Sequence, residues 1–381
     1  MANRFSLIHE WAELRRLFSS TPESRRLVFY AERAFDYRTF EGLLLLLLRT
    51  SQLPIAYITS DPADPLLTQA GDRIRPFFLD RLLPLAVLFL DARVLVMTIT
   101  DLHRFHLRRS VRGAHHLYIF HAMVSTHMVY RFGAFDHYDA LFCVGPHHFK
   151  EVRKMESLYG LPAKRLFEVG YPRLDRILEE HRNFRPAHPP KGKGTILVAP
   201  SWGDANILES CIGPIARSLS SAGYVVVIRP HPEAVKRRPD LIQRISEELC
   251  GLSNVSLERD HLSDQSLHEA DLLISDWSGT ALEYAFGTER PVLFLDVPRK
   301  VNNPRYAELG LEPLESGIRE KIGKILPVSR FQNIAEEAAE MLKNKTDYRE
   351  KILQERSRWV YHLGESASVG TRILLDLCSS P

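Results

Sequence analysis

Residues Asp271–Gly287, DLLISDWSGTALEYAFG, contain the pattern that decides the fold. A short apolar run is followed by small and polar residues, and then by a segment with helical spacing. This order predicts a buried strand over Asp271–Asp276 and a helix over Gly279–Gly287. A strand that enters a helix through a tight turn is the repeating unit of a parallel sheet.

The same unit recurs on both sides of this stretch. Apolar, β-branched runs predict further strands, and the segments between them predict helices. The expected strands are Thr195–Ser201, Tyr224–Pro230, Val255–Arg259 and Pro291–Asp296, and the expected helices are Asn206–Ala222, Pro239–Gly251 and Ser266–Ala270. Continuous apolar strands that alternate with helices indicate a doubly wound domain of the nucleotide-binding type.

The first half of the chain shows a similar alternation. Its expected strands are Arg26–Ala31, Ile55–Thr59, Arg93–Ile99, His116–Phe120, Leu141–Gly145 and Leu166–Val169, and its expected helices are Tyr37–Arg49, Asp80–Leu90 and His147–Tyr159. We therefore expect an α/β protein with two doubly wound, Rossmann-like domains that face each other across a cleft.

The domain boundaries are predicted from composition. Residues 181–194 (HRNFRPAHPPKGKG) are rich in proline, glycine and basic residues, which is typical of an exposed linker. The sequence thus predicts an N-terminal domain over residues 1–180 and a C-terminal domain over residues 195–345. The charged, periodic residues 346–381 predict a helical segment after the second domain, read as one long terminal helix.

Length and charge restrict the class of protein. A chain of 381 residues is long enough for two domains, and 50 basic against 47 acidic residues leave a net charge of only +3. So small an excess argues against a dedicated nucleic-acid-binding protein. The four cysteines lie far apart in the sequence, which predicts free thiols in a reducing cytoplasm rather than disulfides or a zinc site.

The sequence predicts no secretory signal and no membrane span. The charged start of the chain lacks an apolar stretch of the signal-peptide type. The leucine run Leu43–Leu48 is far shorter than the roughly 20 residues that a spanning helix needs. Residues 82–100 are interrupted by Pro84, Asp91 and Arg93, so a helix followed by a buried strand is expected there. We expect a cytoplasmic protein.

Chemically useful side chains follow the predicted strands of the second half. Arg229 and His231, in the sequence RPHP, come directly after one strand, and the sequence SDWSGT (Ser275–Thr280) follows another. Arginine and histidine can bind phosphate oxygens, and a helix start with exposed N–H groups attracts phosphate. Glu283, one turn into this helix, can accept hydrogen bonds from ribose hydroxyls. The alternative is a structural turn and an ordinary helix cap.

The first half offers a candidate base and a conspicuous turn. His121 follows the strand His116–Phe120, and histidine titrates near physiological pH, as a general base must; a structural histidine is the alternative. The turn GYPRLD, Gly170–Asp175, combines a flexible glycine with Arg173 and Asp175, which can pair with each other or reach the cleft. Nine histidines lie within 46 residues, but their spacing with other ligands predicts no metal site.

In this order, the motifs resemble those of the CDP-glycerol glycerophosphotransferase family, the teichoic-acid-type polymerases and primases. That family has a W-H-G-T histidine, a G-x-P-R-N-D turn, an R-x-H-P strand end, a T/S-D-Y-S-S helix start and an F-E-Y helix. The corresponding segments here are FHAM, GYPRLD, RPHP, SDWSG and LEY, over about residues 115–330. The sequence departs from the family pattern at Ala122, Leu174 and Trp277, where the family has glycine, asparagine and tyrosine.

The resemblance implies a GT-B-type fold and transfer of glycerol phosphate from CDP-glycerol with release of CMP. It implies that His121 is the base or orients the acceptor, and that His231 is a second catalytic histidine. It implies that the donor is bound by Arg229, His231, Ser278, Gly279, Thr280 and Glu283, with the pyrophosphate at the helix start and the ribose at Glu283. Asp276 would be a structural or a donor-binding carboxylate. Gly170, Arg173 and Asp175 would shape the cleft. No tightly bound cofactor or metal is implied, and a need for divalent ions is left open.

Several alternatives remain open from the sequence. A GT-B glycosyltransferase or a sugar-nucleotide 2-epimerase would share the paired sheets, and the moved group can equally be ribitol phosphate. A non-catalytic member of a polymer-assembly complex is a third class. The expected acceptor is a polymer or a lipid-linked molecule. The basic, aromatic residues 104–112 (RFHLRRSVR) fit either a solvated loop or peripheral contact with the inner membrane face.

Overall fold

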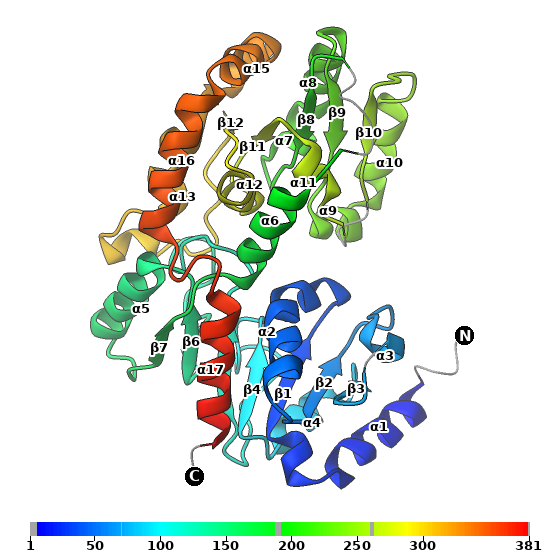
Figure 1. The fold of residues 1–381 in the computed structure, drawn as a ribbon, viewed down its shortest axis with the longest axis vertical. Helices are drawn as coiled ribbons and strands as arrows, with labels where there is room; N and C mark the ends of the chain where they lie inside the picture. Colours follow the sequence, from blue (N-terminus) through cyan, green and yellow to red (C-terminus); the bar gives the residue numbers. More distant parts are fainter. Residues whose placement is uncertain (1–5, 70, 187–191, 260–262, 380–381) are drawn as a thin grey trace.

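The computed structural model describes residues 6–69, 71–186, 192–259 and 263–379. Two parallel sheets with helices on their faces lie one above the other (Figure 1). This arrangement confirms the predicted α/β fold of two doubly wound domains. The first sheet belongs to the first half of the chain and the second sheet to the second half.

The first sheet has seven parallel strands in the order β3-β2-β1-β4-β5-β6-β7. Their bounds are β1 Leu27–Ala31, β2 Ile55–Thr59, β3 Ile74–Phe78, β4 Val94–Met97, β5 His115–Ile119, β6 Ala140–Cys143 and β7 Arg165–Glu168. The second sheet has the order β10-β9-β8-β11-β12-β13. Its strands are β8 Thr195–Val198, β9 Val225–Ile228, β10 Val255–Leu257, β11 Leu272–Ser275, β12 Val292–Asp296 and β13 Gly323–Pro327.

The order of the strands predicts where each domain binds its ligand. In both sheets the order reverses beside the first strand, between β1 and β4 and between β8 and β11. At such a point the two flanking crossovers run to opposite faces of the sheet, which leaves a crevice outside the carboxyl ends of the strands. The loops that follow β8 and β11 are therefore the expected binding loops of the second domain.

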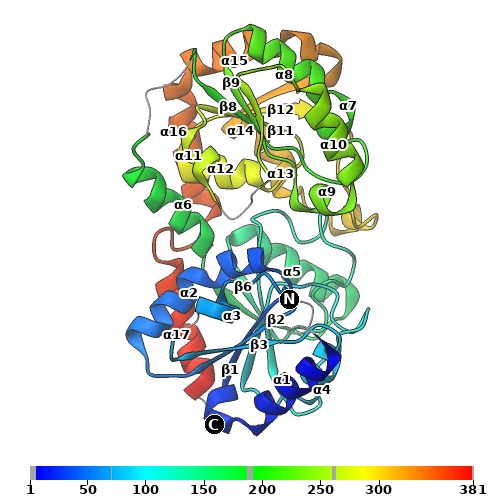
Figure 2. The same cartoon turned by 90° about the vertical axis from the view of Figure 1, so that its right-hand side faces the viewer.

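The helices cover both faces of each sheet (Figure 2). Those of the first half are α1 Leu7–Ser19, α2 Tyr37–Thr50, α3 Leu66–Gln69, α4 Leu83–Phe89, α5 Pro146–Tyr159 and α6 Pro172–Asn183. Those of the second half are α7 Ile207–Ser210, α8 Ile212–Ser221, α9 Pro232–Arg237, α10 Pro239–Glu248, α11 Gln265–Glu269, α12 Thr280–Thr288, α13 Leu314–Gly317, α14 Arg319–Ile322, α15 Ile334–Lys343, α16 Lys345–Trp359 and α17 Ser366–Ser379.

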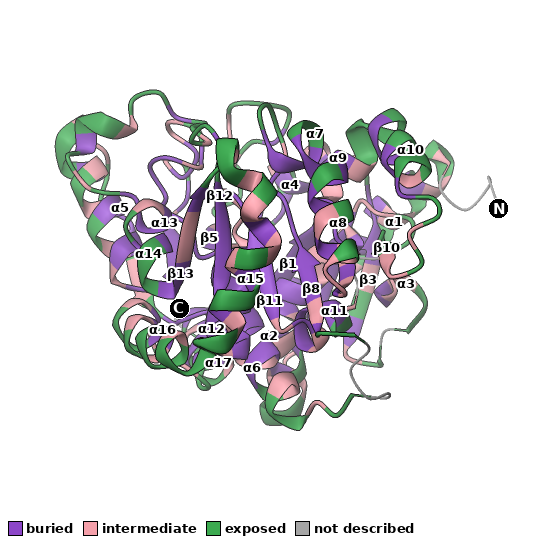
Figure 3. Ribbon diagram, turned by 90° about the horizontal axis from the view of Figure 1, so that it is seen from above, coloured by how far each residue is buried: buried purple, intermediate pink, exposed green. Residues whose placement is uncertain are grey.

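The predicted strands are all present, within a few residues at each end, and two strands were not predicted. The unpredicted strands β3 and β13 lie at sheet edges and contain a proline, Pro76 or Pro327, which removes a backbone donor and weakens the sequence signal. Most inner strands are buried on both sides, as Figure 3 shows by their purple colour, while β9 alternates between buried and partly exposed residues. They read as continuous apolar runs for this reason, and the prediction succeeded there.

The C-terminal segment differs from the single long helix that the sequence suggested. The helix α16 packs on the second domain, and after a break the helix α17 packs against α2 of the first domain (Figure 1). The chain therefore crosses between the domains twice. Buried residues of α17, such as Leu374, share one apolar cluster with Leu43 and Leu47 of α2.

The turn between β7 and α6 fixes this second crossing. The carboxylate of Asp175 accepts hydrogen bonds from the backbone N–H groups of Gly364 (2.7 Å) and Ser366 (2.9 Å), at the N-terminus of α17. Gly170 has a φ of +91°, and a Cβ atom there would lie 2.2 Å from the carbonyl oxygen of Tyr361. Only glycine allows this close approach without strain.

Replacing Asp175 with alanine should loosen the attachment of α17. The change removes two charge-assisted hydrogen bonds at a helix N-terminus, and we expect it to lower the free energy of unfolding by about 1–2 kcal/mol. Urea unfolding followed by circular dichroism measures this. The exposed Asp72→Ala is the matched control. Equal stability of both variants would contradict the assigned contact.

Candidate functional site

Loops from the carboxyl ends of the two sheets touch each other. A Cβ atom at Gly279, before α12, would lie 3.4 Å from the Cβ of Ala122, the residue after His121. Nearby, the backbone N–H and the hydroxyl of Ser125 donate to the carboxylate of Glu315 at 2.8 and 2.7 Å. The loop that follows β5 is thus held directly against the start of α12 in the other domain.

His121 lies at this contact, beyond the end of β5. Its side chain is exposed to solvent. Its Nδ1 lies 3.3 Å from the hydroxyl of Tyr118, and its carbonyl oxygen lies 2.8 Å from the hydroxyl of Tyr171. Part of the ring remains open to solvent, but the surrounding protein displaces much of its water, and this desolvation lowers the pKa of His121 below its ordinary value; the backbone of Thr98 and the carboxylate of Glu283 oppose the shift. The imidazole is therefore accessible and largely neutral at neutral pH, which suits a proton acceptor.

A buried polar network continues from Tyr171 across the domain boundary. The Tyr171 hydroxyl also lies 2.8 Å from Oε1 of Glu283 in α12, and Nε of Arg173 donates to Oε2 of Glu283 at 3.1 Å. Arg173 also donates to the carboxylate of Asp264 at 3.3 Å. Arg38 from α2 pairs with the same carboxylate. All five side chains are buried. Buried charges are stable only when they are paired, so these contacts couple the two domains.

The predicted donor-binding residue Arg229 is a further member of this region. It follows β9 and is buried, and its guanidinium donates to Ser266 Oγ (3.1 Å) and to the carbonyl oxygen of Ser263 (2.9 Å). It also pairs with Glu258 and Asp264 at 3.8 and 3.9 Å. The structure thus places its charge at the carboxyl edge of the sheet, held by the segment that precedes α11.

His231 lies beside an aromatic residue that follows β8. Its Nδ1 accepts a hydrogen bond from the backbone N–H of Glu233 (3.1 Å) and thereby caps α9. Its ring centroid lies 6.0 Å from that of Trp202, and the side chain is partly exposed. One ring nitrogen of His231 thus serves the start of α9, and the ring faces the loop that follows β8.

The residues that follow β11 have separate tasks. The buried carboxylate of Asp276 accepts hydrogen bonds from the backbone N–H groups of Ser201 (2.7 Å) and Ile207 (3.1 Å), and so joins the loops that follow β11 and β8. The expected side-chain cap of α12 is absent, because the Oγ of Ser278 approaches only the N–H of Thr280, at 3.4 Å. A weakly satisfied helix start of this kind retains its attraction for an anion.

The structure brings most predicted site residues to one edge and places four elsewhere: Gly170, Arg173, Asp175 and Glu283. Ser278, Gly279 and Thr280 adjoin His121 through the contact with Ala122. Arg173 and Glu283 lie behind this contact, inside the network, with both Glu283 oxygens engaged. Gly170 and Asp175 face the C-terminal segment, and Arg173 and Asp175 do not pair with each other.

Other site residues were not predicted. Tyr171, inside the quoted turn, bridges His121 and Glu283, and Trp202 stands beside His231. Trp202 follows a predicted strand, so the rule that selected Arg229 applies to it equally. Tyr171 gave no such signal, because its partners are distant in sequence. The departures from the family pattern are packing residues: Leu174 is buried against Gly287, and Trp277 donates its Nε1–H to the carbonyl oxygen of Val297 at 3.0 Å.

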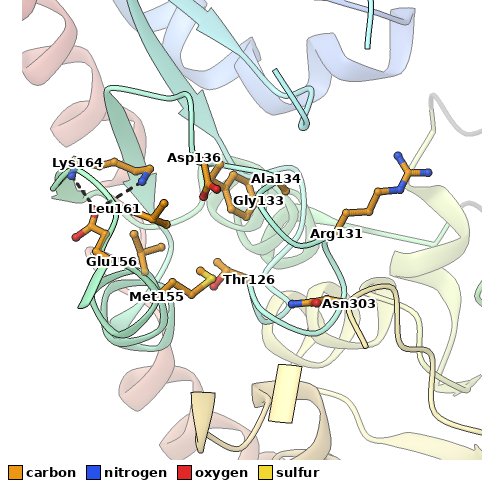
Figure 4. A pocket seen from close by; sticks show the side chains of 12 residues that line it. Thr126, Arg131, Gly133, Ala134, Asp136, Met155, Glu156, Leu161, Lys164 and Asn303 are labelled. Carbon is orange, nitrogen blue, oxygen red and sulfur yellow. Dashed lines mark hydrogen bonds and ion pairs between the residues drawn. The ribbon is translucent and has the colours of Figure 1, made fainter. Parts of the chain in front are cut away.

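Three further features concern metal ligands, cavities and helix length in the described residues. Among the described residues, no group of three or more His, Cys, Asp or Glu side chains could hold a metal ion. The cavity in Figure 4 lies beside α5 and is lined by none of the predicted site residues. Two of its four charged residues, Glu156 and Lys164, are bonded to each other. Within the described part of the chain, no helix combines the length and apolar character that a membrane span requires.

The pKa of His121 can be measured against an internal reference. Desolvation should place the titration midpoint of His121 below the ordinary value of about 6.5. For His127, desolvation also favours the neutral ring, but the carboxylate of Glu151, 3.3 Å from its Nδ1, outweighs this and raises the pKa. We expect NMR titration of the ring Cε1–H signals, assigned with His→Gln variants, to show His121 below His127. The reverse order would contradict the described environments.

Comparisons with known proteins agree with this geometry. No curated protein matches the sequence significantly. The chain resembles the solved structure of the wall teichoic acid polymerase TagF, with a TM-score of 0.63 and 14% identity over 99% of this chain and 96% of that one. It also resembles UDP-GlcNAc 2-epimerase from Neisseria meningitidis bound to UDP-GlcNAc, with a TM-score of 0.60 and 15% identity over 92% and 99% of the chains. These similarities establish the GT-B fold.

The family is shown by sequence. The model of the CDP-Glycerol:Poly(glycerophosphate) glycerophosphotransferase family matches residues 83–373, which is most of the chain and includes every predicted site residue. The resemblance inferred from the ordered motifs is therefore confirmed. This protein belongs to the CDP-Glycerol:Poly(glycerophosphate) glycerophosphotransferase family of transferases.

Proposed function

We propose that this protein transfers glycerol phosphate, or a related polyol phosphate, from a CDP-activated donor to a hydroxyl group of a polymer or lipid-linked acceptor, and releases CMP. The observation that supports this most directly is the position of His121. Its accessible imidazole, with a lowered pKa, stands across the domain boundary from the start of α12. A base and an anion-binding helix start are the two parts that the reaction requires.

The reaction is an in-line displacement at the phosphorus that carries the glycerol. His121 accepts the proton of the acceptor hydroxyl, whose oxygen forms the new bond to phosphorus. The bond from this phosphorus to the oxygen of CMP breaks, and CMP leaves with the electron pair. His231, Ser278 and Thr280, at the carboxyl edge of the second sheet, bind the departing phosphate, and Arg229 adds positive charge there. Positioning and charge stabilisation supply most of such a rate enhancement.

Glu283 acts in this proposal mainly as a positioning residue. The resemblance implies that it binds the donor ribose. In the structure its two oxygens contact Tyr171 and Arg173, and Tyr171 in turn contacts the carbonyl oxygen of His121. We infer that Glu283 sets the distance between His121 and α12, and that any contact with the ribose is made from within this network.

The cell-surface acceptor is inferred from the family and from TagF, which is described as a wall teichoic acid polymerase. The likeness to a UDP-GlcNAc 2-epimerase supports a second candidate, a nucleotide-sugar enzyme. The two candidates differ in the nucleotide that they bind, so they can be separated by ligand binding alone.

A thermal-shift titration against CMP, CDP, UMP, UDP, GDP and CDP-glycerol tests the proposal. We expect selective stabilisation by CDP-glycerol and by CMP, because a ligand that binds only the folded state raises the melting temperature. The variant His121→Ala should retain this shift but lose turnover by roughly 10²–10⁴-fold, and His231→Ala should lose both. The exposed His137→Ala, outside both the site and the proposed membrane contact, is the control.

The pH dependence of kcat/KM tests His121 as the base. Because the pKa of His121 is lowered, the fall of kcat/KM on the acid side should have its midpoint below about 6.5. This fall should be absent from the residual activity of His121→Ala. In the thermal-shift titration, stabilisation by UDP or GDP alone would favour the nucleotide-sugar enzyme. No change in melting temperature with any of the ligands, or full turnover by His121→Ala, would contradict the proposed reaction.

The proposal includes peripheral contact with an anionic membrane face. In residues 104–112, Phe105 and Val111 are 55% and 65% exposed, among exposed arginines. The amphipathic α1 exposes Ile8 and Trp11, at 83% and 52%. Both segments contact α4: the N–H of Val111 bonds the carbonyl of Leu88, and the carboxylate of Glu10 accepts from the N–H of Leu82. Exposed aromatic and aliphatic side chains beside arginines suit a lipid surface.

Sedimentation with vesicles tests this contact. We expect the protein to bind vesicles that contain phosphatidylglycerol and to bind pure phosphatidylcholine weakly. The double variant Phe105→Ser and Val111→Ser should reduce binding several-fold. Leu158→Ser, at a residue 46% exposed on α5, is the matched control. Equal binding by the double variant and the control would contradict the assigned surface.

A further inference from the structure

Lys300 occupies an unusual position at the switch point of the second sheet. It follows β12, and its Nζ lies 4.8 Å from the ring centroid of Trp202, which follows β8. Because β11 lies between β8 and β12, the side chain of Lys300 crosses the carboxyl end of β11. It therefore extends over the loop that holds Asp276 and leads to the start of α12.

The acidic groups nearest to Lys300 are engaged with other partners. Asp276 and Glu233 are the acidic groups that act on it electrostatically. Asp276 already accepts two backbone N–H groups, and Glu233 is paired with Arg33 and with Arg237. No carboxylate of the described residues forms an ion pair with Lys300. Burial lowers the pKa of Lys300 to about 8, because the ammonium has lost water without gaining a carboxylate.

We propose that Lys300 is a phosphate ligand of this site: its ammonium group, held over Trp202, binds the diphosphate of the nucleotide donor. This inference rests on the proposed function and adds a residue to it. A lysine binds phosphate as a point charge and needs no fixed geometry, whereas Trp202 restricts where that charge can lie. The ammonium lies on the same edge as His231 and the start of α12, the two other anion-binding groups of the site.

The ordinary alternative is that Lys300 merely packs on Trp202. Arg237 provides a matched comparison, because its guanidinium lies 5.5 Å from the same ring but is 64% exposed and paired with Glu233 at 2.6 Å. If stacking on Trp202 were the whole contribution, removing either cation should have the same effect. If Lys300 binds phosphate, only its removal should weaken binding of a phosphorylated ligand.

Calorimetric titration of the full chain with CDP, UDP and cytidine tests the proposal. We expect Lys300→Met to weaken CDP binding by roughly 10- to 100-fold and to leave cytidine binding unchanged, with Arg237→Met close to the wild type. The ammonium loses its proton as pH rises through about 8, so wild-type CDP affinity should fall over that range. Lys300→Arg should keep the affinity constant there.

The outcomes separate this proposal from the proposed function. Equal CDP affinity of the wild type and Lys300→Met would overturn the role of Lys300, as would an equal loss for cytidine and CDP. Binding of UDP in place of CDP, weakened by Lys300→Met, would support Lys300 and contradict the CDP-activated donor. A wild type that binds neither nucleoside diphosphate would overturn both.

Discussion

The pairing of buried charges across the domain boundary is the constraint on which the rest of the structure depends. Arg38 and Arg173 come from the first half of the chain, and Asp264 and Glu283 come from the second. Leaving one member of a buried pair without its partner costs about 3–5 kcal/mol. The four groups are satisfied only when the domains are in contact, so the contact and the pairing support each other.

This constraint extends to the reacting groups. Tyr171 joins the charge network to the backbone of His121, and Glu283 belongs to the helix whose start faces the donor. The base and the anion-binding helix are therefore positioned by one set of contacts, although they come from different domains. Loops that follow strands are individually adaptable, but here they are held by buried side chains behind them. The arrangement explains how a site made almost entirely of loop residues can keep its geometry.

The sequence predicted those features of the fold and site that depend on neighbouring residues, and it missed those that depend on contacts between distant residues. The inner strands were found because burial on both faces makes them continuously apolar, and the residues directly after them, such as His121 and Arg229, were found for the same reason. The edge strand β3 and the crossing helix α17 gave weaker signals, since Pro76 resembles a loop residue and α17 follows α16 with a break of only a few residues. Tyr171 and Asp264 act through partners 50 to 226 residues away along the chain, and no local pattern reports such contacts.

The second crossing of the chain has a consequence for how the protein is made. The apolar face of α2, with Leu43 and Leu47, is covered by α17, which follows the second domain in the sequence. During synthesis the ribosome delivers the first sheet long before it delivers the helix that completes its covering. Until the second domain has been translated, the N-terminal domain therefore exposes the apolar face of α2, which chaperones and other nascent chains can bind.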